Sequence, residues 1–358
     1  MEKKTPLYEC HLAAGGKIVP FAGYLLPVQY PAGVIAEHNA VRAACGLFDV
    51  SHMGELLVEG TDALAWLNEV LTNDFTSLAV GRVRYSPMCY PDGGVVDDLL
   101  VYKLAEEKYL IVVNAANREK DVEWLRNQLH GAVSLRDISD EVAQLALQGP
   151  ASDAILASLL PAEQIPAKYY SFTAPVTVAG VECLLSQTGY TGSKGYELYC
   201  RAADAPALWN ALLAAGEPHG LIPCGLGSRD TLRLEAAMPL YGHEMDETIT
   251  PWEAGLDFGV KTAKNFIGRD AIVAKGRPRE RIGLQVTGRG IVREHQDIYF
   301  NGKRIGHSTS GTHCPWLNGA YAMALVESGV VQEGDTVEAD VRGRRVACLV
   351  VPMPFYKR

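Results

Sequence analysis

The hydrophobic and polar positions of this chain follow a helical period in some segments and a strand-like period in others. Apolar residues at helical spacing predict helices over residues 32–46, 61–71, 117–129, 151–161 and 204–216. Between them, alternating apolar residues and turn residues predict antiparallel strands over residues 83–117 and 174–200. Helices mixed with antiparallel hairpins indicate an α+β fold rather than a doubly wound parallel sheet.

Capping residues set the expected ends of these helices. Thr61 and Asn117 precede two of them as N-caps, and Asp204 followed by Pro206 fits a capped first turn. Gly46 is expected to end the first helix as its C-terminal glycine.

The composition changes at the short basic segment AKGRPRER, which is broken by glycine and proline. The chain beyond it reads as strands and turns, with Asn301-Gly302 as one hairpin turn and a further hairpin around Gly343. This pattern predicts a small all-β barrel or sandwich of about eighty residues. We therefore expect a first region over residues 1–275 and a C-terminal β-domain over residues 276–358.

Composition and charge narrow the function classes. The 358 residues leave room for two or three domains, and 48% hydrophobic and 21% charged residues are ordinary for a globular enzyme. The formal net charge of −9 argues against a nucleic-acid partner, because phosphate binding needs a basic surface. The N-terminal MEKKTPLYEC lacks the apolar core of a signal peptide, and no apolar run is long enough to span a membrane. The eight cysteines form no C-x-x-C pair, so we expect reduced thiols in a cytoplasmic protein.

The segment GGVVDDLLVY places two acids in a strand that is otherwise apolar on both faces. Consecutive strand residues point to opposite faces, so Asp98 shares a side with Leu100 and Tyr102 while Asp97 lies on the other side. The pair therefore cannot act as a two-carboxylate dyad in one pocket. Either one acid serves a pocket while the other satisfies backbone amides or a cation, or both are solvated in a turn at the entry of the strand.

Two segments contain a histidine close to acids. In DVSHMGE, His52 and Glu55 suggest a metal site or a general base, but no second histidine lies at metal-ligand spacing. GHEMDE likewise differs from the H-E-x-x-H zinc motif. We favour a hydrogen-bonded structural role for His52.

The segment GLGSRDTLRLEA contains the first half of a G-x-G-x-x-G motif but has Asp230 at the last glycine position, so it is weak support for a dinucleotide site. We expect a loop and a helix capped by Ser228, with Arg229 in the first turn. Because a cation is unfavourable at a helix N-terminus, Arg229 suggests a partner such as a carboxylate or a ligand carbonyl. The alternative is a solvated Arg229 beside a surface Asp230–Arg233 pair.

The segment TGYTGSKGYE is rich in glycine but lacks P-loop order. It suits a turn in which the backbone approaches a ligand closely, with Tyr190 and Glu197 as possible contacts. A plain hairpin is the alternative. The sequence has neither a G-x-S-x-G motif nor the context of a catalytic cysteine.

Taken together, these segments closely resemble the T-protein family of the glycine cleavage system, the tetrahydrofolate-dependent aminomethyltransferases. The resemblance runs nearly from end to end of the chain. It is carried by TPLYECHLAAGGKIVPFAGYLLPVQY, GLFDVSHMGE, LTNDF, GGVVDDLLVY, VVNAANREKD, LALQGP, TGYTG, CGLGSRDTLRLEAAMPLYGHEMDETITPWEAGL, FIGRDA, TSGT and PFYKR. So many long motifs in the family's order argue strongly against chance.

The resemblance implies a three-lobed fold in which the C-terminal β-domain closes a central folate channel. Residues 1–275 would then form a bilobed region with an inner lobe over residues 48–138. In the family's pattern the functional acid is the second aspartate of the pair, which is Asp98 here, and Glu197 and Arg229 match the folate site.

The remaining folate contacts implied by the resemblance are Tyr85, Asn114, Tyr190 and Tyr356, with Lys357 as the alternative to Tyr356. The resemblance implies tetrahydrofolate as co-substrate, no metal, and the lipoylated carrier known as H-protein as partner. A carboxylate such as Asp98 would stabilise cationic charge near the folate nitrogens and assist proton movement from N10.

The chain departs from the common family pattern in three places. Gln187 stands in place of an arginine, Ser193-Lys194 in place of an acidic pair, and the segment GTHCPWLNGAYAMALV in place of GTFSPTL. These departures keep open a folate-dependent demethylase of small methylated compounds. A non-enzymatic folate-binding repair or assembly protein of the iron–sulfur type is less favoured, because TGYTG lacks the cysteine of the KGCY-type motif.

Overall fold

The computed structural model describes residues 2–357, and its elements group into two compact units. The first unit runs to Leu67 and includes Phe75–Tyr85 and Leu99–Arg229. The second contains Asn68–Asp74, Ser86–Asp98 and the chain from Asp230 onward. The chain passes from one unit to the other within α3 (Ala63–Val70), β6 (Val83–Cys89), β7 (Val95–Ala105) and α7 (Leu226–Glu235).

A six-stranded sheet with the order β11-β12-β13-β10-β4-β14 organises the first unit. Its strands are β4 (Cys45–Asp49), β10 (Val142–Gln148), β11 (Phe172–Val178), β12 (Val181–Ser186), β13 (Gly195–Arg201) and β14 (Leu221–Pro223). Strand β14 is parallel to β4, whereas the other neighbours are antiparallel. Strands β12, β13 and β10 therefore form one continuous antiparallel surface, and TGYTG lies in the turn between β12 and β13.

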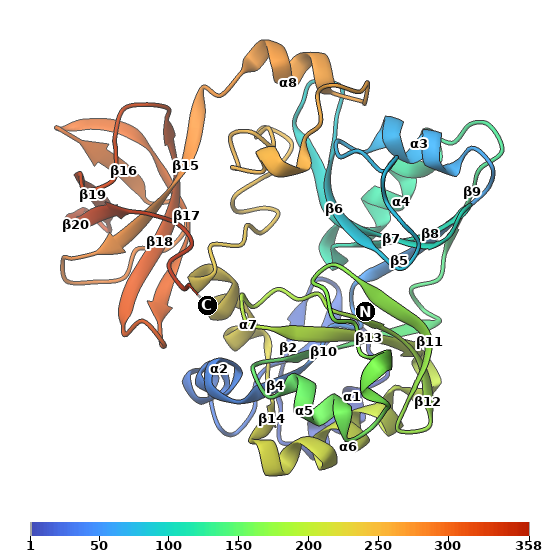
Figure 1. Cartoon of the computed structure of the whole chain (residues 1–358). Coiled ribbons are helices and arrows are strands. Elements are labelled where there is room, and N and C mark those ends of the chain that lie inside the picture. The colour runs from blue at the N-terminus through green and yellow to red at the C-terminus, as the bar shows by residue number, and fades with distance from the viewer. Residues whose placement is uncertain (1, 358) are drawn as a thin grey trace. The chain divides into compact units, whose positions relative to one another are not determined.

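One face of this sheet packs against helices (Figure 1). These helices are α1 (Tyr8–Ala13), α5 (Ser152–Ala157) and α6 (Ala205–Gly216). Alternate residues of the strands, such as Leu145 on β10 and Leu198 on β13, are fully buried there with Trp209 of α6. The intervening strand residues consequently point to the opposite face of the sheet.

That opposite face meets a second sheet, ordered β6-β7-β8-β5-β9. Its remaining strands are β5 (Gly54–Glu59), β8 (Lys108–Val113) and β9 (Ser134–Asp137). A small core containing Tyr102 and Val112 from the second sheet and Tyr199 from the first lies between the two. The face that carries Tyr199 is thus enclosed rather than solvent-facing.

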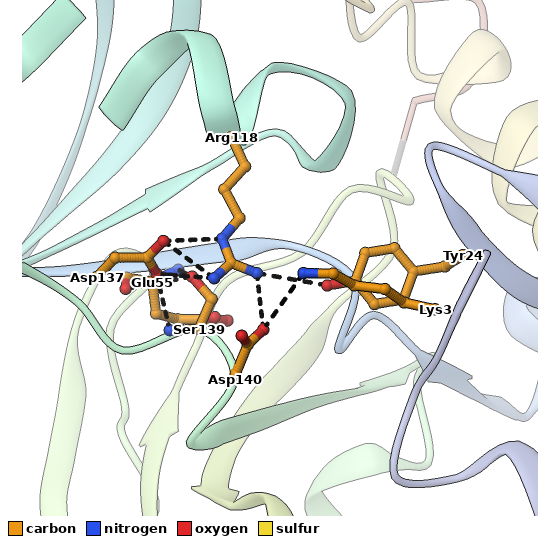
Figure 2. Close-up of polar contacts among 7 residues, drawn as sticks. All are labelled: Lys3, Tyr24, Glu55, Arg118, Asp137, Ser139 and Asp140. Atoms are coloured by element: carbon orange, nitrogen blue, oxygen red, sulfur yellow. Dashed lines mark hydrogen bonds and ion pairs between the residues drawn. The ribbon is translucent and has the colours of Figure 1, made fainter. Parts of the chain in front are cut away.

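The other elements of the first unit are short. They are β1 (Lys3–Lys4), β2 (Lys17–Phe21), β3 (Tyr24–Gln29), α2 (Val34–Ala43), α4 (Arg118–Asn127) and short 3-10 helices at Ala115–Asn117, Ala162–Gln164, Ala202–Asp204 and Glu217–His219. Arg118, at the start of α4, binds Asp137 and Asp140 and so ties the helix to the end of β9 and the turn that follows it (Figure 2).

The second unit contains a closed barrel with the strand order β15-β18-β17-β16-β19-β20. Its strands are β15 (Arg279–Val286), β16 (Asp297–Phe300), β17 (Lys303–Cys314), β18 (Gly319–Glu327), β19 (Thr336–Val341) and β20 (Arg344–Val351). Helix α8 (Arg269–Lys275) and a 3-10 helix at Asp257–Gly259 precede it. Asn301 and Gly302 both have positive φ, as a two-residue hairpin requires, so the predicted turn and the predicted C-terminal β-domain are confirmed.

The predicted helix over residues 32–46 ends earlier than expected. Helix α2 stops at Ala43, and Gly46 lies inside β4 instead of ending the helix. Its lack of a side chain serves packing, because a Cβ there would lie 2.5 Å from Val41 Cγ2 and 2.6 Å from Cys224 Sγ. Asn117 and Asp204 do occupy N-cap positions, but neither side chain makes a capping hydrogen bond.

Candidate functional site

The candidate site in the first unit begins with the alternation along β10, β12 and β13. Because one face of these strands is buried against helices, Gln144, Ser186, Glu197 and Tyr199 share the face toward the second sheet. Ser186 pairs directly with Glu197, and Gln144 pairs with Tyr199, one step diagonal from Glu197. The fold therefore gathers four polar side chains at one place between the sheets.

Glu197 is the buried acid at the centre of this group, with 5% of its surface exposed. Gln144 Nε2 donates to Glu197 Oε1 at 3.1 Å, and Thr188 Oγ1 donates to Oε2 at 2.5 Å. Burial raises the pKa of Glu197, whereas the hydrogen bonds from Thr188 and Gln144 and the charge of Arg229 oppose that rise. A carboxylate oxygen accepts two hydrogen bonds, so each oxygen retains capacity for one ligand donor.

A layer of hydroxyl groups lies behind Glu197. The Tyr102 and Tyr199 hydroxyls lie 2.9 Å apart, and Gln144 Nε2 donates to the Tyr199 oxygen at 3.0 Å. Thr188 Oγ1 lies 3.0 Å from Ser186 Oγ and 3.4 Å from the Tyr102 hydroxyl. Burial raises the pKa of both tyrosines, so their hydroxyls remain protonated donors at neutral pH.

Arg229 and Tyr190 belong to the same site. Arg229 lies in the first turn of α7, as predicted, and its guanidinium lies 4.9 Å from the centre of the Tyr190 ring. Burial lowers the pKa of Arg229, and the charge of Glu197 opposes that effect. Arg229 therefore lies against an aromatic ring and within the field of a buried carboxylate, so the solvated alternative is wrong.

The start of α7 differs from the prediction. The helix begins at Leu226, so Ser228 is inside the first turn and is not its N-cap. Ser228 donates to Glu37 Oε2 at 3.0 Å, and the same carboxylate oxygen accepts the Gly225 N–H at 2.9 Å. A buried acid from α2 thus takes the capping role, which suits the positive end of a helix. The predicted Asp230–Arg233 pair does form, at 2.8 Å, but it is not a surface pair on both sides, because Arg233 is only 3% exposed.

The TGYTG turn is held by Gln148 at the end of β10. Its Nε2 donates to the Thr188 carbonyl at 3.1 Å, and its Oε1 accepts the Thr191 hydroxyl at 2.9 Å. A Cβ at Gly189 would lie 2.1 Å from Gln148 Oε1, and one at Gly195 would lie 2.5 Å from Gln148 atoms. The glycines are therefore required by the glutamine packed between the two arms, and this packing fixes Thr188 next to Glu197.

Asp98 belongs to the second unit, in the first half of β7. Asp97 is fully buried, Asp98 is partly exposed and Leu99 is buried again, in agreement with the predicted opposite faces of the two acids. The alternative of two solvated acids is wrong because Asp97 is inside the fold. Val95 N–H donates to the Asp246 carbonyl at 2.9 Å, which anchors the entry of the strand.

The other predicted contacts are spread over both units. Tyr85, at β6, and Asn114, before the 3-10 helix at Ala115–Asn117, are partly buried residues of the first unit. Tyr356 belongs to the second unit, where its N–H donates to the Glu235 carbonyl at 2.7 Å, while Lys357 is exposed. Among the predicted site residues, Arg229 lies against the Tyr190 ring and feels the charge of Glu197.

His52 is only 3% exposed and lies edge-on to Phe21 and Tyr24, at ring distances of 5.7 and 6.4 Å. Burial, with the nearby charge of Arg229, lowers the pKa of His52 to about 4, so the ring is neutral at neutral pH. The prediction of a hydrogen-bonded histidine is wrong at the Nδ1 atom of His52, which has no hydrogen-bond partner in residues 2–357. Within that same range, no cluster of His, Cys, Asp or Glu could hold a metal ion.

Two of the three departures from the family pattern form polar contacts in the structure. Ser193 Oγ accepts Arg42 Nη1 at 2.7 Å, and Lys194 forms an ion pair with Asp153 of α5. In the barrel segment, the Trp316 N–H donates to Glu235 Oε1 at 3.1 Å. Gln187 is buried beside Thr188, and its side-chain oxygen has no partner in the described part of the chain.

Sequence reasoning missed three members of the site, Gln144, Ser186 and Tyr199. Gln144 interrupts the alternating apolar run VAQLALQ, and a polar residue on the inward phase of such a strand is a recognisable signal. Ser186 and Tyr199 give no comparable signal, because a strand accommodates either residue on either face. Thr188 was part of the TGYTG motif, but its contact with Glu197 depends on the fold of the turn.

Two family models match this chain. The GCVT N-terminal domain matches residues 7–264, and the glycine cleavage T-protein C-terminal barrel domain matches residues 279–357. Curated relatives called aminomethyltransferase include those of Geobacillus sp. (strain WCH70) and Geobacillus kaustophilus (strain HTA426). Each is 48% identical over 363 residues, with 100% of both chains covered.

A solved structure of an aminomethyltransferase is also similar to this chain. The crystal structure of the glycine cleavage system aminomethyltransferase T from Bartonella henselae superposes with a TM-score of 0.92 at 34% identity, covering 99% of this chain and 98% of that one. Across residues 2–357, none of the helices has the length and apolar character needed to cross a membrane.

Proposed function

The chain belongs to the glycine cleavage T-protein family and is an aminomethyltransferase, and from that premise we propose its substrates and the residues that handle them. The acceptor is tetrahydrofolate, and the donor is the aminomethyl group on the lipoyl arm of the H-protein. The observation that carries the proposal is the buried Glu197, whose two oxygens each have one donor from the protein and room for one more.

The acceptor site fits the chemistry of a pterin ring. A pterin presents a ring N–H and an exocyclic NH2 side by side, and a carboxylate can accept both as a bidentate pair. Glu197 supplies that carboxylate, and Arg229 supplies a donor for the pterin carbonyl. Tyr190, which already stacks against the Arg229 guanidinium, adds an aromatic surface. Tyr85, Asn114 and Tyr356 are proposed as further folate contacts.

Asp98 is proposed as the functional acid of the transfer. The donor carbon loses its bond to ammonia and its bond to the lipoyl sulfur and gains bonds to N5 and N10 of the folate. The two folate nitrogens each lose a proton, the sulfur takes one up, and ammonium leaves. A carboxylate near these nitrogens stabilises the cationic charge that develops and accepts the proton from N10.

The first test replaces Asp98 by Asn. Turnover should fall about 1000-fold, since the amide cannot accept a proton or neutralise a cation, while tetrahydrofolate affinity should stay within about threefold. Asp92→Asn is the matched control, because exposed Asp92 accepts the Gly94 N–H, and an amide oxygen also accepts that hydrogen bond. Near-normal turnover of the Asp98→Asn enzyme would remove Asp98 from the proposal.

The second test identifies the donor. Purified protein is mixed with tetrahydrofolate and the aminomethylated H-protein, and 5,10-methylenetetrahydrofolate and ammonia are measured together. We expect both products in equal amounts. Product from a small methylated donor, with none from the carrier, would instead assign the chain as a demethylase.

The proposal also keeps the cytoplasmic location, where a reducing environment would maintain the eight free cysteines as thiols.

A further inference from the structure

We propose that Gln144 and Thr188 are positioning residues for Glu197, each occupying one lone pair of one carboxylate oxygen so that the two remaining lone pairs face the ligand together. This inference rests on the proposed function and deepens it. Neither residue is expected to touch the reacting atoms. Their role is to fix the direction in which Glu197 presents its acceptors, before the ligand arrives.

The division of donors between the two oxygens is the first observation. Gln144 Nε2 lies 3.1 Å from Oε1 and Thr188 Oγ1 lies 2.5 Å from Oε2, so neither oxygen takes both protein donors. Two anchors on different oxygens prevent rotation of the carboxylate about its last bond. A freely rotating carboxylate would lose rotamer entropy on binding a bidentate ligand, whereas a fixed one does not.

The Gln144 amide has its own orientation fixed. Its Nε2 also donates to the Tyr199 hydroxyl oxygen at 3.0 Å, and its Oε1 has no hydrogen-bond partner in residues 2–357. Rotating the amide by half a turn would place its oxygen against the Glu197 carboxylate and lose both donations. The side chain is only 2% exposed, so water offers little compensation for that loss.

The Thr188 hydroxyl has a fixed direction as well. A hydroxyl carries a single proton, and donation to an ionised Glu197 uses it. The Ser186 hydroxyl at 3.0 Å and the Tyr102 hydroxyl at 3.4 Å must then act as donors to Thr188. The hydroxyl layer therefore points toward Glu197 and favours its ionised form.

The strand register explains why these residues can reach Glu197. Ala146, whose side chain is small, lies directly opposite Glu197 on β10. Gln144 reaches across the diagonal, and Thr188 follows β12 at the point where its chain turns back. The titratable groups that face Glu197 are Arg229 from α7, Tyr102 from β7, Tyr199 from β13 and Tyr170 before β11.

The experiment compares Thr188→Val, which keeps the shape and removes the hydroxyl, with Thr188→Ser, which keeps the hydroxyl. Tetrahydrofolate binding is measured by calorimetry across a range of pH. Thr188→Val should raise Kd about tenfold, and Thr188→Ser should restore it to within about threefold of wild type. Thr177→Val makes the same chemical change at an exposed position of β11 and should leave Kd unchanged.

The second readout does not need folate. The infrared band of the protonated Glu197 carboxyl, assigned by its absence in Glu197→Gln, reports the pKa of Glu197 in the free protein. Removing a donor to the ionised form should move that pKa further upward in Thr188→Val. Gln144→Glu should move it upward as well, because two adjacent carboxyls resist ionising together, so acid pH should weaken binding earlier in both variants.

The outcomes separate the inference from the proposed function. An unchanged Glu197 pKa in Thr188→Val, or equal affinities in Thr188→Val and Thr188→Ser, would overturn the positioning role. A lowered melting temperature with neither change would assign a structural role instead. If wild-type protein fails to bind tetrahydrofolate while the band still moves in the variants, the proposed acceptor is overturned and the fixed carboxylate stands. Should Thr188→Val not fold, Gln144→Glu carries the same test.

Discussion

Two of the buried glutamates of the first unit lie in very different surroundings, Glu197 between the sheets and Glu55 on β5. Glu197 is 5% exposed and Glu55 is fully buried. Burial raises the pKa of both carboxyls. They differ in the hydrogen-bond donors around them, because Glu197 has one for each oxygen whereas both oxygens of Glu55 lack a partner in residues 2–357.

The cations and donors near Glu55 are used by other acids (Figure 2). Arg118 directs Nε and Nη2 to Asp137 at 3.0 and 3.1 Å and Nη1 to Asp140 at 2.9 Å. The Ser139 hydroxyl donates to Asp137 at 2.6 Å. Glu55 is therefore best accommodated in its neutral form, whereas Glu197 is prepared to carry charge. Burial alone does not make an acid a binding site; the donors arranged around it do.

The largest effect expected from this contrast follows the replacement of Glu197 by Gln. In this variant an NH2 group replaces one carboxylate oxygen, and that group cannot accept the hydrogen bonds from the protein donor and the ligand donor. The Kd for tetrahydrofolate should therefore rise about 100-fold. Titration calorimetry measures the change. Glu55→Gln is the matched control and should leave Kd within about twofold. Equal loss of affinity in both variants would abolish the distinction between the two acids.

Arg118→Met should act on stability and leave folate affinity unchanged. It removes the partner of Asp137, whose side chain is 21% exposed, and should lower the free energy of unfolding by about 2 kcal/mol. Asp140 adds little, because its side chain is 73% exposed. Urea denaturation measures the loss. Lys3→Met, which removes an exposed ion pair with Asp140 and a cation–π contact with Tyr24, serves as control.

The pH dependence of that loss has a definite sign. Burial acts to raise the pKa of Asp137, but hydrogen bonds from Ser139 and Arg118 outweigh it and lower the pKa. A carboxyl with a lowered pKa contributes stability above its unfolded-state value and loses it as the pH falls through the folded-state value. The difference between wild type and Arg118→Met should therefore shrink in acid. A difference independent of pH would mean that lost packing, not the ion pair, explains the variant.

The stability of Glu55→Gln should show a pH dependence of the opposite sign. Because the pKa of Glu55 is raised, its stabilising contribution is complete below the unfolded-state pKa and is lost as the pH rises toward the folded-state value. An amide does not titrate. The stability of Glu55→Gln relative to wild type should thus increase by about 1.4 kcal/mol per pH unit over that interval. Denaturation at several pH values tests this, and a flat difference would show that Glu55 is ionised in the fold.

Much of the fold could be predicted from local patterns in the sequence. The strands β6, β7 and β8 and the Asn301-Gly302 hairpin follow from alternation and turn chemistry, which act between neighbours in the chain. The opposite faces of Asp97 and Asp98 follow from the two-residue period of a strand. The prediction that Gly46 ends a helix is wrong. A glycine is needed there because a Cβ would collide with Cys224, which is far along the chain.

By itself, the sequence determined the α+β class and the C-terminal β-domain, and the family motifs predict Asp98 and Glu197 as the functional acids. These depend on residue types and on short-range spacing. Only the tertiary structure decided which buried acid has donors. Gln144 and Thr188 reach Glu197 through strand register and a turn held by Gln148, while Asp137 and Asp140 engage the arginine nearest Glu55. Hydrogen bonds at such distances in the chain depend on how strands are paired, and no local pattern specifies that pairing.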